Sequence, residues 1–140
     1  DLLKATAAGQ CDVALANTYY LGRMINSKIN SERKAAKKLA VFWPNQGTGD
    51  RGVHMNVSGA GVTKHAQNIN EAISLLEFLV TDESQKWYAE VNNEYPVVEG
   101  AEISKTLESF GSFKTDNINL TILGVNNPEA VKLMDRAGWR

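Results

Sequence analysis

The 140-residue sequence lacks an excess of charge of either sign. Its 15 Lys and Arg residues nearly balance its 16 Asp and Glu residues, so the formal net charge is -1. Proteins that bind nucleic acid usually carry a basic stripe that neutralises phosphate groups. The charge balance therefore indicates that nucleic acid is not a partner.

The sequence also lacks long hydrophobic runs, and it has a single cysteine, Cys11. Its longest purely apolar stretch, 39–43, is far shorter than the roughly 18 residues that span a bilayer. One cysteine cannot form an intramolecular disulfide, which is compatible with the cytosol and with a secreted protein. With 43% apolar and 22% charged residues, the composition is typical of a globular protein.

What is present is an alternation of strand-like and helix-like segments. Short apolar or alternating stretches predict three strands, at 12–16, 39–43 and 53–57. Helical spacing of apolar residues, or helix-compatible charge, predicts helices at about 17–28, 31–38, 68–80, 82–91 and 128–137. This alternation favours the α/β class, in which helices cover a mostly parallel sheet.

Polar residues occupy the expected helix starts, where a side chain can accept hydrogen bonds from the first free amides. The predicted caps are Asn17 or Thr18, Asn68, Asp82 and Asn127. Pro128 suits the first position of the last helix, and Gly138 suits the residue after its end.

Neither of two glycine-rich stretches fits a nucleotide-binding loop. Residues 47–52 satisfy G-x-G-x-x-G, but a strand-like segment follows where a helix should begin. Residues 59–64 lack the spacing of a Walker A loop. We interpret both stretches as flexible loops.

Catalytic patterns are missing as well. His54 and His65 have no metal-ligating partner at the short spacing of a zinc pair. The sequence contains no nucleophile elbow, and its spacing suggests no Cys–His pair. We therefore expect that the protein is not an enzyme.

The adjacent pair Tyr19 and Tyr20 follows the predicted strand 12–16. Neighbouring residues diverge on a regular strand or helix, so two adjacent phenols are expected to converge only at an irregular turn. The end of a strand is also where open α/β folds bind ligands. The pair is thus either a shared binding site or ordinary packing of two half-buried rings.

Two phenols at one site would suit a hard, highly charged cation. A phenol with an ordinary pKa of about 10 is neutral at pH 7, but a trivalent ion can displace its proton. Softer metals prefer thiolate and thioether ligands, which are nearly absent around the pair. Iron(III) is the natural candidate.

Three segments resemble the periplasmic ferric-iron-binding proteins of bacterial iron ABC transporters, members of the two-lobed periplasmic binding protein superfamily. They read DVALANTYY at 12–20, GVHMNVSGAGV at 52–62 and NEYPV at 93–97. The similarity extends over essentially the whole chain. Its first segment is the most specific, because related binders of organic solutes lack the paired tyrosines.

The resemblance implies roles for three residues. Tyr19 and Tyr20 would supply phenolate ligands to iron(III). Asn17 would help to hold a synergistic anion, phosphate or carbonate, although it is equally suited to cap the following helix. Further iron ligands would come from the opposite lobe, from sequence that precedes this chain in the family.

The resemblance also implies a periplasmic-binding-protein-like fold with three-layer lobes, of which this chain would be a fragment. Residues 1–49 and 101–140 would belong to the tyrosine-bearing lobe, and 50–100 to part of the other lobe. Hinge crossings would lie near 50–52 and 98–100. The missing N-terminal part, or a second copy of the chain, would then cover the exposed apolar faces.

We therefore expect a periplasmic solute-binding protein that captures ferric iron and delivers it to an inner-membrane ABC permease. The chain begins at Asp1 rather than Met and opens without signal-peptide features, so a signal peptide is expected upstream. Two alternatives stay open. One is a binder of an organic or oxyanion solute in the same superfamily, and the other is the ligand-sensing domain of a transcription regulator.

Overall fold

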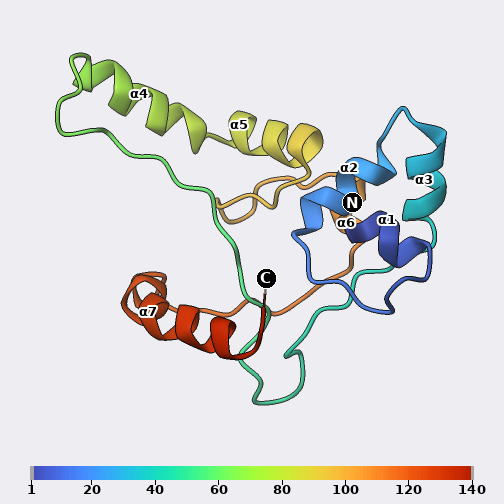
Figure 1. Cartoon of the computed structure of the whole chain (residues 1–140). Coiled ribbons are helices and arrows are strands. Elements are labelled where there is room, and N and C mark those ends of the chain that lie inside the picture. The colour runs from blue at the N-terminus through green and yellow to red at the C-terminus, as the bar shows by residue number, and fades with distance from the viewer. Residues whose placement is uncertain (1, 140) are drawn as a thin grey trace. The chain divides into compact units, whose positions relative to one another are not determined.

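The computed structural model describes residues 2–139, and the regular structure within this range is helical (Figure 1). The helices in chain order are α1 (Leu2–Ala7), α2 (Thr18–Ile25), α3 (Asn30–Ala36), α4 (Ile69–Leu79), α5 (Asp82–Trp87), the π-helix η1 (Tyr88–Asn92), α6 (Lys105–Glu108) and α7 (Thr121–Arg136).

The chain divides into two compact units. The first consists of Asp1–Phe42 and Asn56–Ser112, and the second of Trp43–Met55 and Phe113–Arg140. The first unit thus contains α1 to α6 with η1, and the second contains α7. The division into 1–49 with 101–140 and 50–100 concerns the lobes of a longer fold, and it stays a prediction.

Four predicted helices are confirmed. Their observed counterparts are α2, α3, α4 and α5, the last continuing directly into η1. Their caps differ from expectation, because the Asn68 side chain makes no cap hydrogen bond and Thr81 rather than Asp82 caps α5. The Thr81 hydroxyl accepts a hydrogen bond from the Ser84 amide. Residue patterns along these segments therefore located the helices better than single polar residues located their caps.

The last helix starts earlier than predicted. It begins at Thr121 and runs through Pro128, so the predictions of a cap at Asn127 and of a start at Pro128 are wrong. A proline inside a helix removes one backbone hydrogen bond and crowds the carbonyl four residues earlier. That carbonyl belongs to Gly124, which has no side chain and where an added Cβ would meet no atom within 4 Å outside the helix backbone. The predicted end is confirmed, because Gly138 follows the helix with a left-handed φ of 66°.

The three predicted strands are wrong for this structure. Residues 12–16 and 39–43 form no strand, and 53–57 contributes only an isolated parallel bridge between Val53 and Thr115. A strand exists only when a neighbour accepts and donates its backbone hydrogen bonds. The described residues supply no such neighbour for these segments, although their sequences have strand-like patterns.

The core of the first unit lies where α2 and α3 pack against each other and where α2 meets α6. Its buried apolar residues are Leu21, Met24, Ala36, Ala89, Leu107 and Phe110. Within α2, Leu21, Gly22 and Met24 are buried, whereas Tyr20 and Arg23 are exposed. The inward face of α2 therefore fixes the helix, and its outward face presents a tyrosine.

A polar contact fixes α2 against the turn that follows η1. Asn93 is only 3% exposed and has a left-handed φ of 59°. Asn26 donates from Nδ2 to Asn93 Oδ1 at 2.9 Å and to Thr106 Oγ1 at 3.0 Å. A Cβ atom at Gly22 would lie 2.6 Å from Asn93 Cβ, so the two elements touch without room for another atom.

We predict that Gly22→Ala destabilises the first unit. Overpacking costs about 1–3 kcal/mol, and the better helix propensity of alanine offsets about 1 kcal/mol of this. Because the added Cβ would lie 2.6 Å from Asn93 Cβ, we expect the upper end of the overpacking range and a net loss of about 2 kcal/mol in urea unfolding. Gly61→Ala is the matched control, because no atom lies within 4 Å of its added Cβ and its φ is not left-handed. Equal stability of the two variants would contradict the close contact.

Candidate metal site

The structure brings the two tyrosines together at the start of α2. Their ring centroids are 4.4 Å apart and their planes are tilted by 44°. Both residues lie in the first helical turn, so the expectation of an irregular turn is wrong. Tyr19 is half-buried and Tyr20 is 47% exposed, which leaves the pair accessible to a ligand from solvent.

The contact changes the acidity of Tyr20. A hydrogen bond with Tyr19 and the charge interaction with its phenol raise the pKa of Tyr20 above the ordinary value, with a smaller contribution from desolvation. Arg23, one turn further along α2, opposes this rise. Two neighbouring phenolates repel each other, so without a cation the pair resists double ionisation.

Asn17 belongs to the tyrosine pair rather than to the helix start. It occupies the cap position of α2, but its side chain makes no cap hydrogen bond, so the interpretation as a side-chain cap is wrong. Instead, Asn17 Nδ2 donates to the Tyr19 hydroxyl at 3.2 Å. This contact places an amide donor beside one of the two candidate ligand atoms.

Sequence reasoning missed a fourth member of the site, Asn56. Its Nδ2 donates to Asn17 Oδ1 at 3.2 Å across 39 positions of sequence. Asn56 lies on the polar side of the alternating stretch 53–57. This position is the only feature of the sequence that could have indicated a polar contact for Asn56. We call Asn17, Tyr19, Tyr20 and Asn56 the tyrosine cluster.

The donor set of the tyrosine cluster suits a hard cation. It offers two phenol oxygens and two carboxamides, and no sulfur. Among residues 2–139, no group of three or more His, Cys, Asp or Glu side chains could hold a metal ion. Two phenol oxygens fill only part of the coordination shell of iron(III), so a complete site needs additional ligands.

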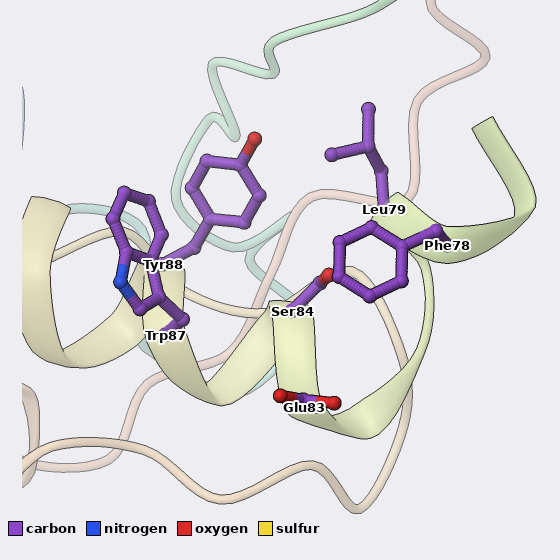
Figure 2. Close-up of a pocket in the computed structure, with 6 residues that line it drawn as sticks. All are labelled: Phe78, Leu79, Glu83, Ser84, Trp87 and Tyr88. Carbon is purple, nitrogen blue, oxygen red and sulfur yellow. The ribbon is translucent and has the colours of Figure 1, made fainter. Parts of the chain in front are cut away.

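A separate cavity of about 300 Å³ lies beside α4, α5 and η1 (Figure 2). Its lining residues are Phe78, Leu79, Glu83, Ser84, Trp87 and Tyr88. The indole of Trp87 meets the ring of Tyr88 edge-on, with centroids 5.4 Å apart. This cavity contains no member of the tyrosine cluster, and its mainly apolar lining is unsuited to a bare metal ion.

The glycine-rich loop 47–52 closes on itself instead of opening onto a phosphate. The Gly47 amide donates to Asp50 Oδ2 at 2.9 Å, and the Lys114 ammonium donates to the carbonyls of Gly47 and Asp50. No helix follows the loop before α4. These contacts hold the loop 47–52 to itself and to Lys114.

None of the helices in the described part of the chain is both long enough and apolar enough to cross a membrane.

Comparison with known protein families identifies the class of the protein. Residues 3–115 match the family described as bacterial extracellular solute-binding protein. This match covers most of the chain, so the protein belongs to that family.

Curated relatives of this chain have names that refer to iron uptake or ferric iron binding. Iron uptake protein A2 of Synechocystis sp. is 44% identical over 138 residues, which cover 99% of this chain and 40% of the relative. The major ferric iron-binding protein of Neisseria meningitidis is 27% identical over the same length, again covering 40% of the relative. The chain therefore spans about 40% of the length of these relatives.

Solved structures confirm the fold. A Trichodesmium protein (IdiA, FutA), solved in complex with iron and citrate, superposes with a TM-score of 0.92 at 49% identity, covering 99% of this chain and 43% of that one. A ferric binding protein from Campylobacter jejuni superposes with a TM-score of 0.90 at 36% identity and 43% coverage of its chain. The chain thus has the fold of part of a two-lobed periplasmic binding protein, as the resemblance implied.

We predict that Tyr19→Phe lowers the pKa of Tyr20 toward its ordinary value in the metal-free protein. The substitution removes both the hydrogen bond and the neighbouring charge that raise this pKa. NMR titration of tyrosines labelled at Cζ would resolve the two rings. Tyr88→Phe is the control, because it keeps the tyrosine pair and should leave the Tyr20 titration unchanged. An unshifted Tyr20 pKa in Tyr19→Phe would show that the two phenols do not interact.

Proposed function

We propose that this chain is part of an extracytoplasmic solute-binding protein that captures ferric iron and delivers it to an ABC-transporter permease. The observation that carries the proposal is the contact between Tyr19 and Tyr20, whose ring centroids lie 4.4 Å apart. The names of the relatives, which refer to iron uptake and ferric iron binding, support it. No enzymatic reaction is part of the proposed role.

Iron(III) is the substrate, and its charge stabilises the ionised form of both phenols. Each phenol loses its proton to solvent as its oxygen binds the cation, and the trivalent ion faces the two phenolate charges that would otherwise repel each other. Hard phenolate oxygen suits iron(III) better than it suits softer metals. The exposure of Tyr20 lets the ion approach from solvent.

An anion would complete the neutralisation of the ion. Asn17 lies beside the Tyr19 hydroxyl, so its carboxamide is placed to contact an anion that shares the iron with the tyrosines. Phosphate and carbonate are the expected anions. The Trichodesmium protein was solved with citrate as well as iron, which supports the general requirement for an oxygen-rich anion.

The remaining steps involve parts of the protein beyond this chain. Further ligands from the opposite lobe would complete the coordination shell, and closure of the two lobes would bury the ion. The inner-membrane permease would favour the open form and so release iron for transport. A signal peptide upstream of Asp1 would direct the protein to the periplasm.

We predict that Tyr19→Phe combined with Tyr20→Phe abolishes the visible phenolate-to-iron absorption band. The variant keeps both rings but removes the only two phenol oxygens of the tyrosine cluster. Ferric citrate should be titrated into the whole protein and followed by absorbance and calorimetry. Tyr95→Phe is a matched control because its hydroxyl donates to the Leu107 carbonyl rather than to this cluster. A colourless wild-type protein, or a band that survives the double substitution, would refute the proposal.

We also predict that reduction of the bound iron releases it. Phenolate is a hard, charged ligand, so it binds the divalent ion much more weakly than the trivalent one. Dithionite should bleach the visible band, and a ferrous chelator should then remove the metal. Gallium(III), a hard trivalent ion that dithionite does not reduce, should stay bound under the same treatment. Retention of iron after reduction would mean that softer ligands hold it.

A further inference from the structure

We propose that Asn56 is a positioning residue that sets the direction of the hydrogen bonds within the tyrosine cluster. Asn56 donates to Asn17, and Asn17 in turn donates to Tyr19. Asn56 would thereby hold an amide N–H group toward the phenol oxygen that binds the metal. This inference rests on the proposed function, because it concerns Tyr19 as a phenolate ligand.

The first observation is the unused cap. An asparagine at the residue before a helix normally accepts hydrogen bonds from the amides of the first turn. Asn17 has the extended backbone of such a cap, with φ of -70° and ψ of 143°, but its side chain makes no cap hydrogen bond. Its oxygen instead accepts from Asn56 at 3.2 Å. Asn56 therefore competes with the amides of α2 for this oxygen and directs the side chain toward the tyrosines.

The second observation is the polarity that results. A phenolate has no proton and can only accept hydrogen bonds. The group that faces Tyr19 is Asn17 Nδ2, a donor, at 3.2 Å. A carboxamide has its donor and acceptor on opposite branches, so a protein donor to Oδ1 favours the orientation in which Nδ2 faces Tyr19. Asn56 Nδ2 is that donor.

The third observation is the location of Asn56. It lies in the irregular segment 54–68, which forms no helix or strand between the Val53 bridge and α4 (Figure 1). Its side chain is exposed, so its hydrogen bond to Asn17 is not a by-product of burial in the core. Both asparagines belong to the same compact unit. The contact therefore links an irregular backbone segment to the start of α2 through side chains alone.

The test is Asn56→Asp, which keeps the shape of the side chain but replaces its donor with an acceptor. The carboxylate should attract Asn17 Nδ2, so that Asn17 Oδ1 turns toward Tyr19 and the phenolate loses its donor. Loss of an orienting partner beside a metal ligand typically costs 10–100-fold in affinity, so we expect about tenfold weaker iron binding. The phenolate-to-iron band should move to longer wavelength, because the phenolate electrons are no longer stabilised by the hydrogen bond.

Two control variants separate polarity from charge. Asn56→Gln keeps the amide donor on a longer side chain, and it should weaken iron binding and shift the band less than Asn56→Asp. Ser58→Asp adds the same charge two residues away in an exposed position, and it should change neither the affinity nor the band. Circular dichroism and urea unfolding of each variant should match the wild type, because Asn56 is exposed.

The outcomes separate this inference from the proposed function. A wild-type protein without a phenolate-to-iron band refutes the proposed function itself. A normal wild-type band that is unchanged in position and affinity in Asn56→Asp refutes only the role of Asn56. Equal effects of Asn56→Asp and Ser58→Asp would also refute it, because charge rather than hydrogen-bond direction would then explain both.

Discussion

The close approach of α2 to the turn after η1 is the constraint on which the candidate site depends. Gly22 and Asn93 touch without space for a Cβ atom, and Asn26 donates across the same boundary. Helix α2 is only 8 residues long, too short to be stable alone, so this contact and the buried Leu21 and Met24 hold it in place. The buried face of α2 therefore fixes the helix, and this fixes the position of the tyrosines at its start. A rigid inner face allows the outer face to keep two phenols in contact.

That contact has one specific consequence for the acidity of the metal-free protein. The hydrogen bond with Tyr19, and then the charge interaction with its phenol, make ionisation of Tyr20 harder. A concentrated positive charge beside the pair would offset both effects and favour the ionised form. The amide of Asn17 adds a donor to Tyr19, and Asn56 fixes the direction of that donor. These contacts support our proposal that the arrangement is a site for a cation.

The sequence could predict the helices and the tyrosine pair, and it failed where structure depends on distant partners. Periodicity located α2 and α4 because a helix satisfies its backbone groups locally. The strand pattern at 12–16 could not reveal whether a neighbouring strand was available, and none of the described residues pairs with it. Asn17 looked like a cap because local rules ignore Asn56, 39 residues away. Tertiary hydrogen bonds therefore decided the features that local patterns misjudged.

The failed strands and the partial metal shell have a common explanation. Val13, Leu15 and Phe42 lie in segments with the pattern of buried strands, yet they are 83%, 79% and 84% exposed. Exposed apolar segments of this kind normally mark surfaces that another element covers. The tyrosine cluster similarly supplies only part of what iron(III) requires. Because the chain spans about 40% of the length of its curated relatives, we propose that the same additional polypeptide covers these segments and completes the site.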